Sequence, residues 1–373
     1  MSPPSILMIG IGEYTTGLVS GTQSTSDKKL GVVALTLFDL RTDDVVDAEA
    51  YKTAIDALPE RGSCVTIFTP DSTHFDIAMY AVERGHHVLI TKPAVKLLAH
   101  HVELLEASRK HGVFVYVEHH KRFDPAYADA RHRAKTSLGD FNYFYSYMSQ
   151  PKSQLETFKA WAGRESDISY YLNSHHVDVC VSMVDGWVPR VVRASASKGI
   201  AEGLGCMEGT EDTITLMVDW QREGKRATGI YTASWTTPQF AGVHSNQSFH
   251  YMASKGEIRI DQAKRGYNVA ADDQGQLVWY NPFYMKYAPD EEGNFNGQTG
   301  YGYISFEKFV DAVTKLREGK VTLEELDQRD LPTLANTIAT TAILEAGRRS
   351  LDDGGRGVEI VVGEKDGEGW LLK

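Results

Sequence analysis

The sequence predicts an α/β protein in which an N-terminal, doubly wound parallel sheet is followed by an α+β domain with a large, open, mainly antiparallel sheet. Three observations lead to this prediction. Residues 63–95 alternate a buried strand, a helix and a second buried strand, and a glycine-rich turn follows the first apolar run of the chain. From residue 141 onwards, apolar and polar side chains alternate with period two. We therefore expect one domain at 1–124 and another at 125–373.

The composition is that of an ordinary globular protein with room for two domains. Of the 373 residues, 42% are apolar and 24% are charged. The formal net charge of −11 argues against a nucleic-acid-binding surface, because such surfaces neutralise phosphates with clustered basic side chains. An anionic ligand would need a local basic pocket.

The cysteines and the N-terminus predict a cytoplasmic protein. Cys64, Cys180 and Cys206 are an odd, scattered set without metal-ligand spacing, which is typical of reduced thiols in the cytosol. The first residues lead into an apolar strand without a charged leader, and no apolar run approaches the length that spans a bilayer. We expect neither secretion nor membrane insertion.

The chain opens with a strand and a glycine-rich turn. Ile6–Ile9 is apolar, and GIGEYTTG follows at residues 10–17. Gly10 and Gly12 match the first two glycines of the dinucleotide fingerprint, which allow a tight turn and the close approach of a pyrophosphate to a helix N-terminus. Thr15 stands where the third glycine is expected, so an ordinary glycine-rich connection remains an alternative.

A second strand is expected at Gly31–Leu40. Asp39 near its end could accept hydrogen bonds from a ribose 2′-hydroxyl, whereas the guanidinium of Arg41 could pair with a 2′-phosphate. The alternative is that Arg41 is solvated and that only Asp39 acts. Between Asp39 and Cys64 only one helix fits, at Asp47–Leu58, although a doubly wound sheet normally has a further helix and strand there. Residues 40–63 are therefore either truncated or lack an insertion.

The central crossover lies in residues 63–95. Cys64–Thr69 is a short, β-branched apolar run, which predicts a strand buried on both faces. A helix follows, capped by Ser72 or Thr73 and ended by Gly85. His87–Thr91 predicts a second strand, and a crossover of this length implies parallel pairing.

Lys92 and Pro93 follow the second strand of this crossover. Ligands of open α/β sheets bind at the carboxyl ends of the strands, where these residues are expected. A lysine in this place is often only a solvated end charge. The proline, however, fixes the backbone and so presents the ammonium from a stiff turn. Lys92 is therefore a candidate functional residue.

A polar cluster follows the next predicted strand, Val113–Val117. Residues 118–125, EHHKRFDP, bring one acid, two imidazoles and two cations to the same edge of the sheet. Metal binding is the alternative, but adjacent histidines on an extended segment point to opposite sides. We expect no metal site.

The second half of the chain has the pattern of an antiparallel sheet. Strands are expected at 141–148, 213–220, 227–235, 248–253, 257–261 and 277–280, with turns at glycines 224, 256 and 275. Helices are expected at 306–316 and 331–350, and small residues suited to close packing line the second helix, which we place near the domain junction.

A histidine motif precedes the later strands of this sheet. If Ser174–Met183 is helical, His175 and Asp178 lie on one face and apolar residues face the core. A lone histidine in such a place is more often structural than catalytic. Together with a lysine and a nucleotide loop, His175 becomes a candidate proton donor.

These motifs together resemble the glucose-fructose oxidoreductase, inositol dehydrogenase and rhizopine catabolism (Gfo/Idh/MocA) family. The glycine-rich loop, TPDSTHFDIAMYAVERGHHVLITKPAV at 69–95 and the histidine motif follow that family's order over nearly the whole chain. Within the family, GEYTTG, VEHHKRFDPAYADA, YFYSYMSQPKSQL, SDISYYLNSHH and NPFYMKY resemble the fungal D-galacturonate reductases. The resemblance implies a Rossmann dinucleotide-binding domain at 1–124 and a substrate-binding and oligomerisation domain at 125–373.

The resemblance also implies roles for individual residues. Lys92 matches the signature lysine, which approaches the nicotinamide ribose and the reacting oxygen, and His175 matches the histidine that acts as acid and base. Thr91 replaces the signature glutamate and Tyr171 replaces a frequent aspartate, so Tyr171 or Asp178 would assist proton transfer. Cofactor contacts are expected from Gly10, Gly12, Glu13, Tyr14, Thr15, Asp39, Arg41, Thr69, Pro70, His74, Lys92 and Glu118. Substrate contacts are expected from Lys121, Arg122, Tyr171, Asn173 and His176.

The implied activity is reduction of the aldehyde of D-galacturonate to L-galactonate, a step of pectin sugar-acid catabolism, with NADPH preferred over NADH. Hydride transfer leaves negative charge on oxygen, which needs a cation to stabilise it and an acid to protonate it, and Lys92 and His175 are those groups. Lys121 and Arg122 would meet the uronate carboxylate, with Lys286 as a weaker candidate.

Two alternatives to this activity stay open. One is a reductase or dehydrogenase of another sugar or of inositol. The other is a nucleotide-binding regulator without catalysis, as in the fungal galactose repressor, which resembles the same family. The presence of both Lys92 and His175 favours an enzyme. We also expect a homodimer through the open face of the sheet, where Tyr143 and Tyr145 or their alternates lie.

Overall fold

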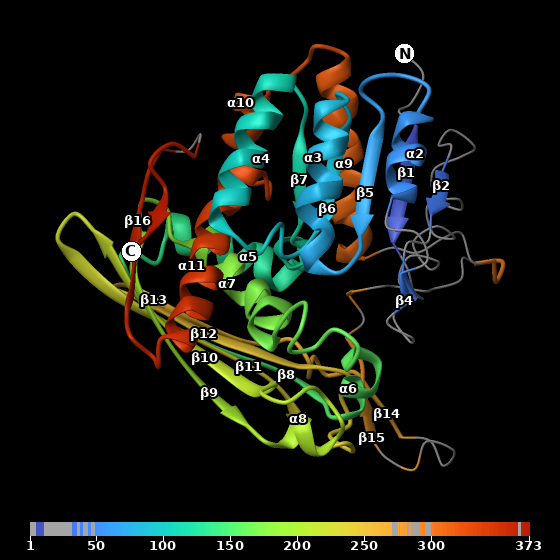
Figure 1. The fold of residues 1–373 in the computed structure, drawn as a ribbon. Helices are drawn as coiled ribbons and strands as arrows, with labels where there is room; N and C mark the ends of the chain where they lie inside the picture. Colours follow the sequence, from blue (N-terminus) through green and yellow to red (C-terminus); the bar gives the residue numbers. More distant parts are fainter. Residues whose placement is uncertain are drawn as a thin grey trace. The chain divides into compact units, whose positions relative to one another are not determined.

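The chain forms two compact units, each assembled from separate stretches of sequence (Figure 1). The computed structural model describes residues 5–10, 32–35, 38–39, 44–45, 49–270, 275, 277–281, 283–284, 291–294, 300–364 and 367–373. Unit 1 comprises Met1–Phe123, Tyr284–Ile338 and Lys365–Glu368. Unit 2 comprises Asp124–Phe283, Ala339–Glu364 and Gly369–Lys373.

Unit 1 contains the predicted parallel sheet. Its five strands have the order β2-β1-β5-β6-β7, and every neighbouring pair is parallel. The strands are β1 (Ile6–Gly10), β2 (Val32–Leu35), β5 (Cys64–Phe68), β6 (His87–Thr91) and β7 (Val115–Glu118). The chain winds one way from β1 to β2 and the other way from β5 to β7, so the prediction of a doubly wound sheet is confirmed. Ligands of such sheets bind outside the carboxyl ends of the strands, where the strand order reverses.

Helices cover both faces of this sheet, which explains why its strands are apolar throughout. The helices on one face are α2 (Ala50–Asp56), α3 (His74–Glu83) and α4 (Leu98–His111), and those on the other are α9 (Tyr301–Arg317) and α10 (Leu323–Asp327). Leu7 and Ile9 of β1 belong to the first core, and Ile6 and Met8 belong to the second. One strand therefore contributes to both cores by alternation of its side chains.

The second strand is shorter than the sequence predicts. β2 spans Val32–Leu35, and Leu35 pairs with Ile9 of β1. Residues Phe38–Asp39 (β3) pair instead with Asp44–Val45 (β4) in a separate antiparallel pair. The prediction of one continuous strand at Gly31–Leu40 is therefore wrong, whereas the helix expected before Cys64 is present as α2.

The predicted side-chain cap of α3 is also wrong. Thr73 is the N-cap residue of α3, but its hydroxyl accepts no hydrogen bond from the helix. Instead it donates to the carbonyl oxygen of Pro70 at 2.8 Å and lies 2.7 Å from Thr69 Oγ1. The short 3-10 turn η1 (Asp71–Thr73) directs the hydroxyl back toward the end of β5. Gly85 follows the helix with φ of 78°, a left-handed conformation that favours glycine.

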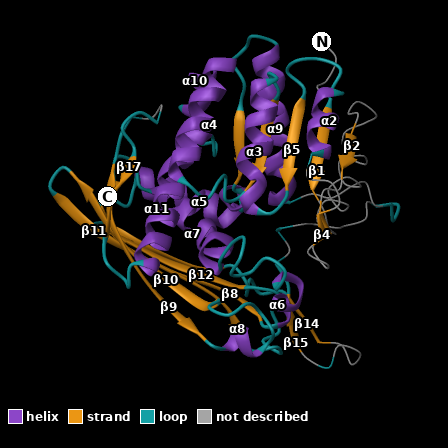
Figure 2. Cartoon of the chain, in the orientation of Figure 1, coloured by secondary structure: helices purple, strands orange, loops and turns teal. Residues whose placement is uncertain are grey.

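Unit 2 contains the predicted large sheet, drawn as orange strands in Figure 2. Its eight strands have the order β13-β12-β8-β11-β10-β9-β16-β17, and only the β8–β11 pair is parallel. The strands are β8 (Phe141–Pro151), β9 (Val188–Lys198), β10 (Glu211–Arg222), β11 (Lys225–Thr237), β12 (Asn246–Ala253), β13 (Gly256–Asp261), β16 (Val358–Val361) and β17 (Leu371–Leu372). The mainly antiparallel sheet is thus confirmed.

One predicted strand lies outside this sheet, and three strands of the sheet itself were missed. The strand expected at 277–280 is β15 (Leu277–Trp279), which pairs only with β14 (Asn268–Ala270), its neighbour along the chain. The sequence did not predict β9, β16 or β17. In β9, Pro189 and two arginines interrupt the apolar alternation, so the local pattern does not predict a strand. Its pairing with β10 stabilises the strand instead.

Helices cover one face of the large sheet, and the other face is open. The unit 2 helices are α5 (Pro125–Thr136), α6 (Ser153–Phe158), the π-helix η3 (Ser169–Asn173), α7 (Ser174–Met183), α8 (Ile200–Gly203) and the C-terminal part of α11 (Leu334–Asp352). A Cβ on Gly347 of α11 would lie only 2.5 Å from Leu216 Cδ2 of β10, so the small residues of α11 allow close packing. On the open face, Tyr145, Met217 and Met252 are 40%, 37% and 38% exposed. Among the described helices, none has the length and apolarity needed to cross a membrane.

Candidate active site

Lys92 lies directly after the carboxyl end of β6, as predicted. β6 ends at Thr91, and the Lys92–Pro93 peptide bond is cis. Burial lowers the pKa of the Lys92 ammonium to about 8, and the carboxylates of Asp71 and Glu118 oppose part of that shift. A half-buried lysine that exchanges its proton near neutral pH is suited to stabilise charge on a reacting oxygen. Sequence reasoning missed Asp71, whose position in the first turn after β5 is the signal that could have identified it.

Glu118 and His120 form a buried pair at the end of the neighbouring strand. Glu118 is the last residue of β7 and is 3% exposed, and its Oε2 lies 2.8 Å from His120 Nδ1. The imidazole of His120 stacks on Tyr301 at 5.8 Å between ring centroids and lies 5.3 Å from the ring of Tyr284. The two aromatic rings and the contact with Glu118 therefore fix the orientation of the His120 imidazole. The sequence placed His120 in a polar cluster but assigned it no role.

Thr69 and His74 belong to the turn between β5 and α3. Thr69 is 8% exposed, and its hydroxyl contacts that of Thr73. His74 is fully buried, with Nδ1 facing the carbonyl oxygens of Pro93 and Ala94 and Nε2 facing that of Thr69. Predicted cofactor contacts from Thr69, Pro70 and His74 stay predictions.

Most of the predicted nucleotide loop lies outside the described residues. This applies to Gly12, Glu13, Tyr14, Thr15, Arg41 and Lys286, and of Asp39 only the backbone is described. Gly10 is described and has φ of 152°. A Cβ at this position would lie 2.4 Å from the carbonyl oxygen of Phe68 in β5, so only glycine fits where β1 ends.

The histidine motif of unit 2 forms the predicted helix. α7 runs from Ser174 to Met183, and His175 and Asp178 are 7% and 1% exposed. Tyr171 belongs to the preceding π-helix, where its ring lies 4.9 Å from Phe158 and 5.6 Å from Trp161. Tyr171 thus stands in an aromatic cluster one turn before the histidine.

Asn173 and His176 make internal contacts in unit 2. The side-chain amide of Asn173 donates to Ser169 Oγ at 3.0 Å and lies 3.3 Å from the carbonyl oxygen of Ile214. His176 Nε2 lies 3.1 Å from the hydroxyl of Tyr127, and both rings are buried. These contacts orient the start of α7. Substrate binding by Asn173 and His176 stays a prediction.

The start of the π-helix η3 is held by the buried carboxylate of Asp167, which sequence reasoning missed. Asp167 Oδ1 accepts hydrogen bonds from the backbone N–H groups of Ser169 and Tyr170 at 2.8 and 2.9 Å. Its Oδ2 lies 3.3 Å from Arg348 of α11, which also pairs with Glu211 at 3.0 Å. Burial raises the pKa of Asp167, and Arg348 opposes that rise. The available signal was a carboxylate two residues before Ser169, the first residue of η3, where it can cap the start of a helix.

Lys121 and Arg122 lie in the 3-10 turn η2 (His120–Phe123) and are almost fully buried. They are 4% and 2% exposed, and Arg122 Nη2 lies 3.5 Å from the carbonyl oxygen of Asn336. Their predicted contact with a substrate carboxylate stays a prediction. Among the described residues, no group of three or more His, Cys, Asp or Glu side chains could hold a metal ion.

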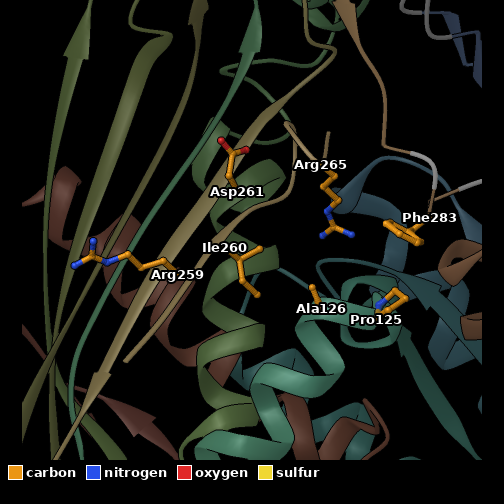
Figure 3. Close-up of a pocket in the computed structure, with 7 residues that line it drawn as sticks. All are labelled: Pro125, Ala126, Arg259, Ile260, Asp261, Arg265 and Phe283. Carbon is orange, nitrogen blue, oxygen red and sulfur yellow. The ribbon is translucent and has the colours of Figure 1, made fainter. Parts of the chain in front are cut away.

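A separate pocket of about 340 Å³ lies within unit 2, and none of the predicted site residues lines it (Figure 3). Its lining residues are Pro125, Ala126, Arg259, Ile260, Asp261, Arg265 and Phe283. The guanidinium of Arg265 lies 5.4 Å from the ring of Phe283 and makes two contacts with Asp124, at 2.9 and 3.0 Å. Asp124 thus neutralises Arg265, one of the two arginines that line this pocket.

Comparison with known sequences finds a likeness in the N-terminal part of the chain. Residues 5–119 match the Gfo/Idh/MocA profile, described as an oxidoreductase family with an NAD-binding Rossmann fold. An uncharacterised oxidoreductase of Escherichia coli K12, YdgJ, is 30% identical over 121 residues, which are 32% of this chain and 35% of YdgJ. The scyllo-inositol 2-dehydrogenase (NAD+) of Bacillus subtilis 168 is 41% identical over 69 residues, which are 18% of this chain and 20% of that enzyme. The matches thus span about a third or less of the curated relatives.

Comparison with solved structures extends the likeness to nearly the whole chain. The inositol dehydrogenase homologue of Azotobacter vinelandii, solved with NADH and myo-inositol, has a TM-score of 0.71 at 18% identity over 96% of this chain and 98% of its own. The myo-inositol 2-dehydrogenase of Lactobacillus plantarum has a TM-score of 0.67 at 19% identity over 96% and 99%. At these identities the likeness establishes the fold. The match to the predicted family covers residues 5–119, its NAD-binding part, and the fold class is confirmed for both parts of the chain.

Proposed function

We propose that this chain, whose residues 5–119 match the NAD-binding domain of the Gfo/Idh/MocA oxidoreductase family, reduces the aldehyde of D-galacturonate to L-galactonate. The observation that carries the proposal is Lys92, a half-buried ammonium with a pKa lowered to about 8 at the carboxyl end of a Rossmann strand. The residues that we assign to the cofactor and the substrate are those predicted from the sequence. We likewise keep 1–124 as the dinucleotide-binding domain and 125–373 as the substrate domain.

The proposed chemistry needs one cation and one acid. When bound, a reduced nicotinamide supplies the hydride. Lys92 stabilises the negative charge that develops on the aldehyde oxygen, and His175 donates the proton that completes the alcohol. Asp71 and Glu118 help to keep Lys92 in the charged form on which this role depends. Gly10, which tolerates no side chain at the end of β1, fits the fingerprint glycine that such a cofactor needs.

A second candidate function is the dehydrogenation of an inositol or the reduction of another sugar. It is favoured by the names of the relatives, several of which are inositol dehydrogenases. A panel of uronates, their parent aldoses and inositols, tested in both reaction directions with both nicotinamide cofactors, separates the two. Galacturonate should give the highest kcat/KM with NADPH. A higher value with inositol would replace the first proposal by the second, and binding without turnover of any member would indicate a regulator.

Cofactor choice gives a test of Arg41, which lies outside the described residues. If its guanidinium pairs with the 2′-phosphate, Arg41→Ala should raise the KM for NADPH by at least about tenfold, because a charge-assisted hydrogen bond contributes roughly 1.5 to 3 kcal/mol. The KM for NADH should change little. Steady-state kinetics with both cofactors measures this, and an equal change for both would show that Arg41 does not select the cofactor.

We further propose that two chains pair through the open face of the large sheet. Met217, Tyr145 and Met252 come from three different strands of that face and are each more than a third exposed. Light scattering of the purified protein should give twice the chain mass of 41.4 kDa. The double variant Tyr145→Glu with Met252→Glu should give a monomer, because a dimer of this variant would have to bury unpaired carboxylates in its interface. Phe240→Glu, at a loop residue that is 82% exposed, is the control and should stay dimeric.

The thiols agree with a cytosolic location, which we include in the proposal. Cys64, Cys180 and Cys206 are all free and buried. Burial raises the pKa of the Cys64 and Cys180 thiols to about 12, so both side chains are uncharged at neutral pH. Such thiols are suited to a reducing compartment.

A further inference from the structure

His74 joins two segments that meet at the proposed active site. Its ring is fully buried at the start of α3 in unit 1. Nδ1 lies 2.9 Å from the carbonyl oxygen of Pro93 and 3.2 Å from that of Ala94, and Nε2 lies 2.9 Å from that of Thr69. One side of the ring therefore contacts the turn that begins at Lys92, and the other contacts the end of β5.

These contacts show what the ring can do. A carbonyl oxygen only accepts hydrogen bonds, so each ring nitrogen must donate wherever a bond is made. Both nitrogens face backbone carbonyls, and the ring is shielded from solvent, so its polar atoms are directed at the protein's own backbone. The neighbouring charges have a different effect. Asp71 of η1 and Glu118 of β7 act on the charge of Lys92, whereas His74 contacts the backbone that carries Lys92.

We propose that His74 is a positioning residue, and that its Nδ1–H holds the Lys92–Pro93 turn so that the ammonium meets the reacting oxygen. This inference rests on the proposed role of Lys92. Catalysis is sensitive to such placement, because a displacement of about 1 Å can lower a rate by about 100-fold. This role replaces the direct cofactor contact that the sequence predicted for His74, because both ring nitrogens face backbone carbonyl oxygens.

Two amide variants separate the two sides of the ring. The side-chain nitrogen of asparagine is as many bonds from Cα as Nδ1, and that of glutamine as many as Nε2, and each amide nitrogen can donate. His74→Asn therefore retains a donor toward Pro93 and Ala94, and His74→Gln retains one toward Thr69 alone. We expect kcat to fall on the order of 100-fold in His74→Ala and His74→Gln, and to recover largely in His74→Asn, while the KM for the cofactor changes little in all three. Equal loss in the Asn and Gln variants would overturn the assignment to Nδ1.

A second measurement tests the position of Lys92 without using activity. Reductive 13C-methylation lets each lysine be titrated by NMR, and the Lys92 signal is the one that disappears in Lys92→Met. Its pKa should be about 8 in the wild-type chain and should move toward the ordinary value in His74→Ala and His74→Gln, because a released turn exposes the ammonium to water. A Lys92 titration unchanged in His74→Ala would overturn the proposal.

His101 provides the matched control. It is also fully buried in unit 1, and its Nε2 lies 2.9 Å from the carbonyl oxygen of Leu334 in α11. His101→Ala should lower thermal stability and leave both kcat and the Lys92 titration near their wild-type values. If the wild type turns over no sugar while the Lys92 titration still responds to His74, the proposed function fails and the positioning contact stands.

Discussion

Replacing Lys92 with methionine is expected to lower turnover by about 100-fold or more, because methionine has similar length but cannot stabilise negative charge on the reacting oxygen. The affinity for NADPH, measured by fluorescence titration, should change little. Wild-type kcat/KM should also fall as the pH rises through about 8, since Lys92 loses its proton there, and the variant should lack that decline.

The control for this substitution lies in the same connection. Lys96→Met removes an ammonium four residues further along, and its turnover should stay near that of the wild type. His175→Ala should lower turnover to a similar extent as Lys92→Met, because it removes the proton donor. Near-normal turnover in either active-site variant would exclude that residue from its proposed role.

The largest effect on stability is expected from Asp124→Ala. Asp124 is fully buried, makes two contacts with Arg265, accepts a hydrogen bond from Gln262 at 3.0 Å, and caps α5 through the N–H of Ala126. Its removal leaves the largely buried Arg265 without a counter-charge, and breaking such a pair typically costs about 3 to 5 kcal/mol. The free energy of unfolding of unit 2 should fall by that amount.

Urea unfolding followed by tryptophan fluorescence measures this change in unit 2 alone. All six tryptophans lie within the sequence ranges of unit 2. Asp129→Ala is the matched control on the same helix, because Asp129 pairs with Arg133 at the surface, and exposed pairs contribute at most about 1 kcal/mol. A loss below about 1 kcal/mol in Asp124→Ala would show that the buried pair is not needed for stability.

Local pattern was sufficient where an element has a strong period and a clear end. The strands β5 and β6, the helix between them and the helix Ser174–Met183 all occur where the sequence predicts them. These elements fix the positions of Lys92, directly after β6, and of His175, in α7, while the roles of both residues stay predictions. The local pattern failed at two places. It did not predict that β2 ends at Leu35. It also predicted a helix cap at Thr73, whose hydroxyl donates instead to the carbonyl oxygen of Pro70.

The sequence by itself predicted the fold class of both units and supplied the two residues proposed for catalysis, because hydrophobic periodicity and helix-terminating glycines act within a few residues. The tertiary structure alone decided which distant segments meet. α9 covers the second face of the first sheet although it begins at Tyr301, far beyond Glu118 at the end of that sheet's last strand. Likewise Arg265 neutralises Asp124, and His74 contacts the carbonyls beside Lys92. These contacts depend on how separate elements pack, and a local sequence pattern does not show which distant residue a side chain will contact.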